Sequence, residues 1–327
     1  MRHAVLKGVE YALPDSVLSN EDLAKDFPEW SIEKIEAKTG ISQRHIARAD
    51  EYASDFACLA AQKLFASYKV TAEAIDFILY CTQSPDYALP TTACMLQERL
   101  ACSNAVGALD YNLGCSGYVY GLAMAKGLIE THQANNVLLL TADTYSKYIE
   151  PNDKTVRTIF GDGASASWIG NDASQVSIFP AAFGTDGRGA KNLIAHGSGL
   201  KKAEEGLHGL KMNGPEIFTF TLDVVPDIIQ KSLGRAGIQE EQIDLYVFHQ
   251  ANQYMLEFLR KKMNIPTSKF VFKLREFGNT VSSTIPIALT EILKNNEAKG
   301  CKYVMLVGFG VGYSWGAVVI DLEAMSS

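Results

Sequence analysis

The sequence predicts an α/β protein made of two duplicated halves, with helices covering both faces of two sheets. Helical segments alternate with nearly continuous apolar runs such as residues 136–142 (NVLLLTA) and 303–308 (YVMLVG). Such runs are typical of strands that are buried on both faces. An internal repeat is the second observation, because the same order of elements occurs twice along the chain.

The repeat covers two pairs of segments. Residues 56–87 and 222–254 each have the pattern of helix, turn, strand and loop, with AIDFILY in the first aligned to QIDLYVF in the second. Residues 115–143 match residues 279–310 as loop, amphipathic helix, polar turn and buried strand. The order of the elements therefore agrees between the two copies.

From this agreement we expect one half over residues 1–172 and a second half over residues 173–327. Residues 177–214 are rich in glycine and polar residues and show weak periodicity. They predict a strand pair with surface loops.

Composition excludes several classes of protein. With 327 residues, of which 47% are hydrophobic, the chain can bury a large core. A net charge of -7 argues against binding to nucleic acid. We find neither a signal peptide nor an apolar run long enough to cross a membrane, and we expect a cytoplasmic protein. The six cysteines show no disulfide or metal-ligand spacing, so we predict reduced thiols and no metal.

Four loops that follow predicted strands are candidates for the active site. In open α/β sheets, ligands bind at the carboxyl ends of the strands. The loops begin with residues 81–83, with Cys115, with His249 and with Asn279, the last of which follows a strand expected at residues 272–278. Three of the four carry residues that suit one chemistry.

Cys115 lies between Gly114 and Ser116, directly before a helix expected from about Tyr118 to Glu130. Free amide groups at the start of that helix would stabilise a thiolate, and the small neighbours would give an acyl group access. The alternative is a small buried apolar residue. We favour the nucleophile, since a Gly-Cys-Ser-Gly sequence packs poorly in a core.

His249 and Asn279 suit the step in which a second thioester substrate becomes an enolate. Each has a simpler interpretation, which is a hydrogen-bonded histidine at a strand end or an asparagine that caps a helix. Beside a cysteine nucleophile, however, two neutral side chains can donate hydrogen bonds to a thioester oxygen as an enolate develops. An amide cannot act as a base, so the carbanion would form by loss of carbon dioxide.

Five motifs in the same order resemble the β-ketoacyl-[acyl-carrier-protein] synthase III family of the thiolase superfamily. They are LGCSGYVYGL, IFGDGASA, FHQANQYM, FGNTVSSTIP and GFGVGYSWGAVVI. The resemblance implies a homodimer with a thiolase-like fold in α-β-α-β-α layers and a catalytic triad of Cys115, His249 and Asn279. It also implies decarboxylative condensation of an acyl-coenzyme A primer with malonyl-acyl-carrier protein, without a cofactor.

The resemblance implies further roles around the triad. The backbone N–H groups of Cys115 and Val311 would form the oxyanion hole, Phe309 would shield the thiol, and Leu89 would reach the acyl pocket of the partner subunit. Coenzyme A contacts are implied for Trp30, Lys38, Lys154, Phe218 and Asn252. A surface for the carrier protein is implied for Arg260, Lys261 and Lys262.

Departures from the family pattern leave two alternatives open. Tyr254 and Thr219 replace basic residues, and Val311 replaces a glycine. A synthase III-like condensing enzyme or acyltransferase of a specialised pathway, such as polyketide or secondary-metabolite synthesis, would accommodate these changes. A non-catalytic ketosynthase partner subunit is the other alternative, but such subunits lack the nucleophile.

Overall fold

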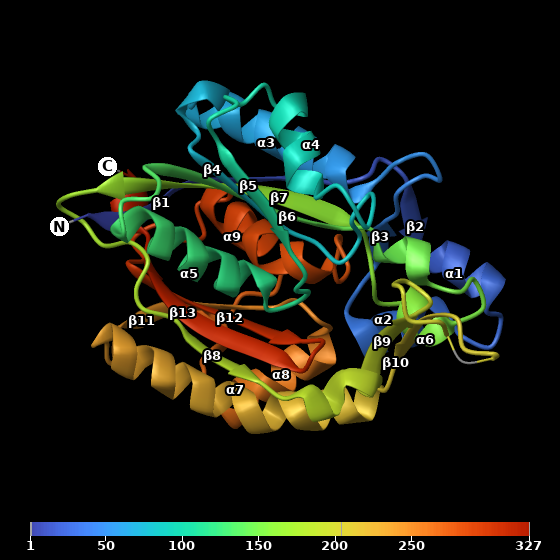
Figure 1. Cartoon of the computed structure of the whole chain (residues 1–327). Helices are drawn as coiled ribbons and strands as arrows, with labels where there is room; N and C mark the ends of the chain where they lie inside the picture. The colour runs from blue at the N-terminus through green and yellow to red at the C-terminus, as the bar shows by residue number, and fades with distance from the viewer. Residues whose placement is uncertain (1, 204, 327) are drawn as a thin grey trace.

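Two sheets run through the protein, a computed structural model that describes residues 2–203 and 205–326 (Figure 1). The strand order of the first sheet is β1 (His3–Ala12), β7 (Gly163–Asp172), β6 (Asn136–Asp143), β4 (Phe77–Cys81) and β5 (Gly107–Tyr111). The order of the second is β11 (Ile243–Phe248), β12 (Tyr303–Gly310), β13 (Ser314–Asp321) and β8 (Ala182–Thr185).

Helices form three layers around these sheets. The layer outside the first sheet contains α3 (Ala53–Tyr68) and α4 (Thr92–Arg99), and the layer between the sheets contains α5 (Gly117–Glu130) and α9 (Thr284–Lys294). The layer outside the second sheet contains α7 (Gly214–Ala236) and α8 (Gln253–Lys262). The layered α/β class predicted from the sequence is therefore confirmed.

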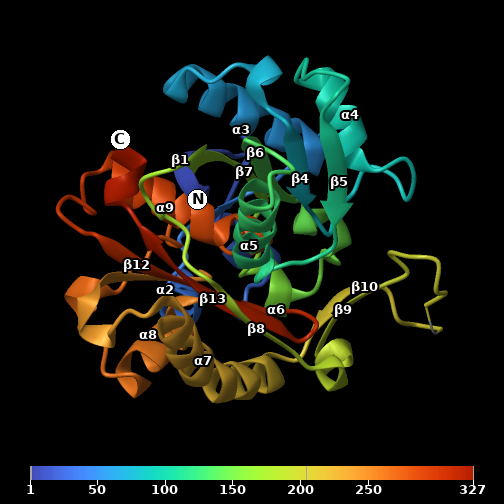
Figure 2. The ribbon, with the colours of Figure 1, turned by 60° about the vertical axis from the view of Figure 1, so that its left-hand side comes forward.

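Smaller elements gather at one end of the layers (Figure 1). They are β2 (Val17–Ser19), β3 (Gln43–His45), α1 (Asn20–Asp26), α2 (Ile32–Thr39), α6 (Lys154–Arg157), β9 (Leu193–His196) and β10 (Gly209–Met212). Short 3-10 turns lie at Ala72–Ala74, Tyr145–Tyr148, Gly187–Asn192, Glu240–Gln242, Thr267–Lys269, Val281–Ser283 and Glu323–Ser326. The antiparallel β9–β10 pair, which Figure 2 shows extending away from the sheets, confirms the strand pair predicted within residues 177–214.

The two sheets repeat one pairing pattern. In the first sheet β4 is parallel to β6, and β6 is antiparallel to β7, which is antiparallel to β1. In the second, β11 is parallel to β12, and β12 is antiparallel to β13, which is antiparallel to β8. The segments aligned in the sequence, AIDFILY and QIDLYVF, contain all of β4 except Cys81 and the whole of β11.

The strand expected before Asn279 is not formed. Within residues 2–203 and 205–326, only an isolated bridge between Tyr246 and Phe270 continues the second sheet beyond β11, at the place where β5 pairs with β4 in the first. The backbone N–H of Lys273 donates instead to the side-chain oxygen of Gln250, at 2.7 Å. The chain then turns at Gly278, whose φ of 69° favours glycine. Residues 272–278 are thus a loop, because side-chain and turn contacts replace the sheet hydrogen bonds.

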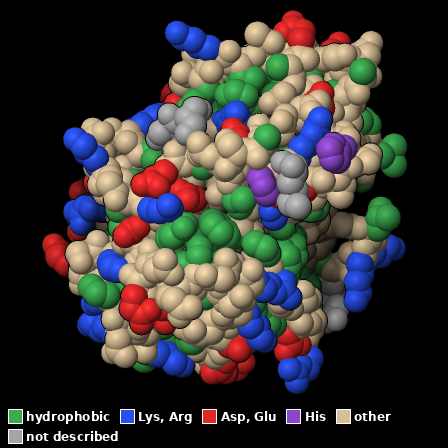
Figure 3. Space-filling model, turned by 90° about the vertical axis from the view of Figure 1, so that its left-hand side faces the viewer, with side chains coloured by type: hydrophobic (Ala, Val, Ile, Leu, Met, Phe, Trp, Pro, Cys, Tyr) green, Lys and Arg blue, Asp and Glu red, His purple; other side chains and the backbone are tan. Residues whose placement is uncertain are grey.

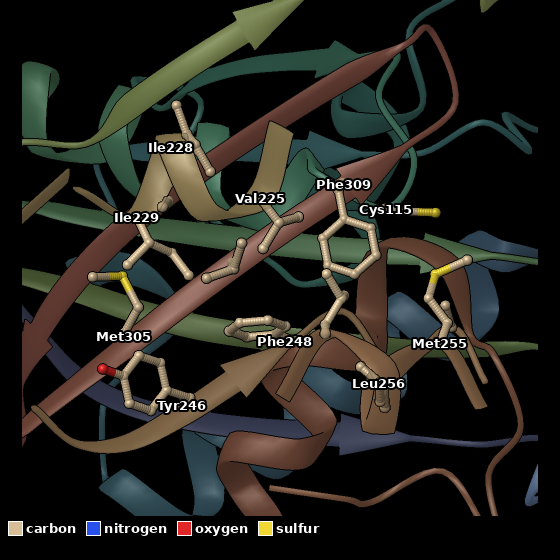
Figure 4. Packing of buried hydrophobic residues seen from close by; sticks show 14 of the residues in the cluster. Cys115, Val225, Ile228, Ile229, Tyr246, Phe248, Met255, Leu256, Met305 and Phe309 are labelled. Atoms are coloured by element: carbon tan, nitrogen blue, oxygen red, sulfur yellow. The ribbon is translucent and has the colours of Figure 1, made fainter. Parts of the chain in front are cut away.

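Buried side chains from several layers meet at the first candidate residue. Cys115 belongs to a hydrophobic cluster that includes Val225 of α7, Phe248 of β11, Met255 of α8 and Phe309 of β12. Figure 4 shows Cys115 and Met255 at one end of this cluster, next to Phe309. Across residues 2–203 and 205–326, no helix has the length and apolar character needed to cross a membrane.

Candidate active site

Cys115 lies just before α5, in the loop that connects β5 of the first sheet to the central helix layer. Its side chain is buried, and Ser116 takes the N-cap position of α5. The backbone of β12 lies against the thiol. A Cβ added to Gly310 would lie only 2.8 Å from the sulfur. A strand of the second half therefore fixes the position of a side chain from the first.

Burial makes Cys115 a thiol in the free protein. Desolvation, together with the charge of nearby Asp143, raises its pKa from 9.0 to about 12. The backbone N–H groups of Val311 and of Cys115 itself act in the opposite direction but are outweighed. The amide groups beside Cys115 thus act in the direction expected from the sequence, but burial outweighs them in the free protein.

His249 follows β11 directly and is buried as a neutral imidazole. Burial lowers its pKa from 6.5 to about 3. Its Nδ1 lies 2.7 Å from the hydroxyl of Thr284, and that hydroxyl lies 3.2 Å from the carbonyl of Val281. If the hydroxyl donates to the carbonyl, Nδ1 carries the ring proton and Nε2 presents its lone pair, 3.4 Å from Nδ2 of Asn279.

Asn279 is held by its backbone and by its amide oxygen. Its N–H donates to the carbonyl of Ile159 at 2.9 Å, and its carbonyl accepts from Gly161 at 3.0 Å. The amide oxygen accepts from the N–H of Val281, which leaves the NH₂ group directed at His249. A Cβ on Gly161 would lie 2.6 Å from the carbonyl of Phe277, so the glycine-rich FGDGASA segment serves close backbone packing, as the sequence indicates.

A buried carboxylate connects the two halves behind the cysteine. Asp143, the last residue of β6, accepts from the N–H of Gln83 at 2.7 Å and from both the N–H and the hydroxyl of Ser282. Burial raises its pKa from 3.8 to about 7. Sequence reasoning singled out the loop of Gln83 but missed Asp143. The available signal was a charged residue at the end of an otherwise apolar strand.

One cavity of about 590 Å³ brings the three predicted residues together. Cys115, His249 and Asn279 line it, as do Phe309, Phe218 and Asn252. A second hollow, which contains Trp30, continues it towards the surface. The two share the lining residues Lys38, Ile159, Met212, Gly214, Pro215 and Asn252.

Positive charge surrounds the outer end of this channel. The ammonium groups of Lys38, Lys34 and Lys154 lie 4.7, 5.5 and 5.8 Å from the ring centre of Trp30. Lys154 also pairs with Glu29. This end of the channel therefore combines an aromatic ring with cations, a combination that suits an anionic ligand with a planar group.

The remaining predicted residues lie outside the cavity wall. Leu89 is 82% exposed and is not part of the cavity wall. On α8, Arg260 binds Glu257 and the carbonyl of Ile265, and Lys262 donates to the carbonyl of Leu222. Only Lys261 of the predicted basic cluster has no contact of this kind among the described residues.

Charges elsewhere on the surface are mixed. Figure 3 shows one face of the molecule on which Lys and Arg side chains are interspersed with Asp and Glu. Within the described part of the chain there is no group of three or more His, Cys, Asp or Glu side chains that could hold a metal ion.

Sequence comparison gives a consistent picture. Residues 109–187 match the family described as 3-oxoacyl-[acyl-carrier-protein (ACP)] synthase III, and residues 233–322 match its C-terminal part. A β-ketoacyl-[acyl-carrier-protein] synthase III from Caldanaerobacter subterraneus subsp. tengcongensis is 35% identical over 97% of each chain.

Solved structures agree with this relationship. A 3-oxoacyl-(acyl-carrier-protein) synthase III matches with 49% identity and a TM-score of 0.94, over 98% of this chain and 99% of that chain. The 3-oxoacyl-(acyl carrier protein) synthase III of Pseudomonas aeruginosa PAO1 matches with 31% identity and a TM-score of 0.90, over 98% of both chains. The chain described here thus belongs to the β-ketoacyl-[acyl-carrier-protein] synthase III family of condensing enzymes.

Proposed function

We propose that the protein starts fatty acid synthesis by decarboxylative condensation of an acyl-coenzyme A primer with malonyl-acyl-carrier protein. The observation that carries this proposal is the single cavity lined by a thiol, a neutral imidazole and a primary amide, from Cys115, His249 and Asn279. Membership of the synthase III family supports it. In this proposal residues 1–172 supply the nucleophile and residues 173–327 supply the imidazole and the amide.

The first step is transfer of the acyl group to Cys115. The thiol proton passes to Nε2 of His249 as the sulfur attacks the thioester carbonyl. The backbone N–H groups of Cys115 and Val311, both of which favour negative charge on this sulfur, hold the oxyanion. Collapse breaks the bond to the coenzyme A sulfur, which leaves with the proton from Nε2.

The second step is formation of the carbon nucleophile. Loss of carbon dioxide from the malonyl carboxylate leaves an enolate, whose oxygen accepts a hydrogen bond from Nδ2 of Asn279. A hydroxyl both donates and accepts, so Thr284 can turn to donate to Nδ1, which places the ring proton on Nε2 as a second donor. The enolate carbon then attacks the acyl carbonyl, the bond to the Cys115 sulfur breaks, and the departing thiolate takes from solvent the one proton that the overall reaction consumes.

The outer channel and α8 supply the binding surfaces in this proposal. Trp30, Lys38, Lys154, Phe218 and Asn252 would hold coenzyme A, which enters as substrate, and the reaction uses no cofactor. Lys261 and Lys262, with Arg260 held in place by Glu257, would receive the acidic carrier protein. We also propose a cytoplasmic homodimer, in which the exposed Leu89 of each chain contributes to its partner's site.

Intact-protein mass spectrometry tests the proposal. Wild type and Cys115→Ala are incubated with a panel of acyl-coenzyme A thioesters, and malonyl-acyl-carrier protein is then added to the loaded enzyme. We expect an acyl adduct on wild type alone, followed by loss of the adduct and release of carbon dioxide. The same adduct on Cys115→Ala, or no adduct from any thioester on folded wild type, would disprove the proposal.

A further inference from the structure

Arg44, on β3 among the smaller elements at one end of the layers, is a buried cation without an acidic partner (Figure 1). The residue is 0% exposed, and burial lowers the pKa of its guanidinium from 12.5 to about 10. Its hydrogen bonds go to two neutral oxygens. Nε and Nη2 donate to the carbonyl of Thr158, and Nη1 donates to the side-chain oxygen of Asn20 at 2.5 Å. Within residues 2–203 and 205–326, no carboxylate forms an ion pair with Arg44.

A buried charge of this kind is a poor source of stability. The desolvation of a guanidinium commonly costs more free energy than its hydrogen bonds return, and an apolar side chain of similar length avoids that cost. What arginine adds is direction, because its planar fork holds several acceptors at once in one geometry. The contribution of Arg44 to the protein therefore lies in what it holds in place.

The side chain of Arg44 runs between the two segments that meet at Asn279. A Cβ added to Gly161 would lie 3.3 Å from Cβ of Arg44, and one added to Gly278 would lie 3.0 Å from its Cγ. The aliphatic part of the arginine is thus in close contact with both glycines. A side chain at either position would displace it, so the two glycines make room for Arg44.

The guanidinium holds the segment to which the backbone of Asn279 is bonded. Its acceptor is the carbonyl of Thr158, directly before Ile159. The carbonyl of Ile159 accepts from the N–H of Asn279 at 2.9 Å, and the N–H of Gly161 donates to the carbonyl of Asn279 at 3.0 Å. A shift of residues 158–161 would therefore move the backbone of Asn279 and, with it, the amide in the cavity.

The other contact of the guanidinium leads to the outer channel. Asn20, at the start of α1, donates in turn to the carbonyl of Ile41 at 2.8 Å, two residues after the end of α2. The end of α2 and Thr158 both line the hollow that continues the cavity towards the surface. Arg44 is not among the residues that line the cavity or this hollow. It therefore connects two walls of the channel from outside the space that a ligand would occupy.

We propose that Arg44 is a positioning residue for the amide of Asn279. Through the carbonyl of Thr158 it fixes residues 158–161, and these fix the backbone of Asn279 beside the channel. Loss of the guanidinium displaces the amide from the enolate, whereas Cys115 stays in place because α5 and β12 hold it. This inference rests on the proposed function, because it concerns the step in which Asn279 stabilises the enolate.

Separate measurement of the two half-reactions tests the role of Arg44. Wild type and Arg44→Met are loaded with acetyl-coenzyme A, and release of carbon dioxide from malonyl-acyl-carrier protein is followed in a single turnover. The rate is expressed per acylated molecule, so an unfolded fraction does not enter it. We expect carbon dioxide release to slow by about 10-fold to 100-fold in Arg44→Met, since small displacements of a reacting group cost this much. Acylation should stay within about threefold of wild type, because Asn279 takes no part in it.

Arg157→Met is the matched control. Arg157 lies directly before Thr158 and also donates to a carbonyl, that of Pro151 at 3.0 Å. It differs from Arg44 because it pairs with Asp26 at 2.8 Å and its side chain is 24% exposed. The same substitution at this position should leave both half-reactions within about threefold of wild type.

A double variant shows whether Arg44 acts through Asn279. If it does, Arg44→Met should slow decarboxylation no further in a chain that already carries Asn279→Ala, because the group that it positions is absent. Arg44→Lys keeps the charge but cannot hold both acceptors in the geometry of a guanidinium, so its loss should be smaller than that of Arg44→Met. It replaces Arg44→Met in each comparison if the methionine variant yields no acyl-enzyme.

The outcomes separate the two proposals. Four results overturn the positioning role and leave the proposed function intact: unchanged decarboxylation in Arg44→Met, equal slowing of both its half-reactions, the same slowing in Arg157→Met, or further slowing in the Asn279→Ala background. Absence of an acyl adduct or of carbon dioxide release in wild type overturns the proposed function, and this inference with it.

Discussion

The two halves share one pairing pattern but contribute different things to the cavity. The first half places one reactive sulfur at the start of a helix, next to a complete fifth strand, β5. In the second half the corresponding strand is reduced to the bridge between Tyr246 and Phe270, and the released chain forms the loop that carries Asn279. In place of a fifth strand, the second half thus has a loop that positions the amide of Asn279, whereas the first half has a complete edge strand.

The division of labour predicts that the two half-reactions can be separated, and this is the largest effect we expect. Asn279→Ala removes the amide donor, so decarboxylation of malonyl-acyl-carrier protein should fall about 100-fold to 1000-fold, as for loss of one oxyanion donor. Acylation of Cys115 should remain within about threefold of wild type, since Asn279 does not take part in it in the mechanism above. Single-turnover measurement of each half-reaction checks this, and equal loss of both would show that the halves do not divide the work.

Asp143 provides the next test, because it joins the halves whereas Asp162 does not. Asp162 is also buried, with its pKa raised to about 6, but it accepts from Ala47 and Ser146, which lie in the first half. The folded chain holds the Asp143 proton more tightly than the unfolded chain, since the pKa is about 7 against 3.8. Its contribution to the free energy of unfolding is therefore complete below about pH 4 and is lost as the pH rises through about 7.

At about 1.4 kcal/mol for each pKa unit, the loss is on the order of a few kcal/mol. Denaturant unfolding from pH 4 to 8 should show this decline in wild type and a smaller one in both Asp143→Asn and Asp162→Asn. Only Asp143→Asn should also slow decarboxylation, because Asp143 binds Ser282, which lies in the same loop as Asn279. A similar loss of decarboxylation in Asp162→Asn would argue against a special link at Asp143.

Contact between the halves at Gly310 predicts a smaller effect. Gly310→Ala places a methyl group 2.8 Å from the sulfur of Cys115, and such overpacking typically costs about 1–3 kcal/mol. We expect acylation to slow by about tenfold or more, which corresponds to about 1.4 kcal/mol of the barrier. Unchanged kinetics of acyl loading in Gly310→Ala would mean that β12 does not fix the thiol.

The smallest effect comes from helical glycines away from the contact between the halves. Gly127 in α5 and Gly234 in α7 have no atoms within 4 Å of an added Cβ. Each change to alanine should stabilise the protein by about 0.5–1 kcal/mol, because glycine is a poor helix former. Thermal unfolding measures this, and acyl loading should be unaffected in both variants. A lower melting temperature of either variant would show that the space around that glycine is not open.

The fold could be predicted from the sequence because periodicity and the repeat depend on local residues. Runs such as NVLLLTA specify buried strands wherever they lie, and the positions after strands pointed to Cys115 and His249. The loop over residues 272–278 was mistaken for a strand, since its contact with Gln250 is made by a side chain 23 residues away. Asp143 and the high pKa of Cys115 were missed for a related reason. Burial depends on all the layers together, and no local pattern reports it.

The neutral state of the cavity has a consequence for chemical selectivity. Peroxides and alkylating reagents attack the thiolate form of cysteine, and that form is scarce when the pKa is about 12. The resting enzyme is therefore protected from indiscriminate electrophiles. In the mechanism proposed above, a thioester differs from them because its carbonyl oxygen would enter between the N–H groups of Cys115 and Val311 while Nε2 of His249 takes the proton. The site thus becomes reactive in the presence of the group that it is shaped to receive.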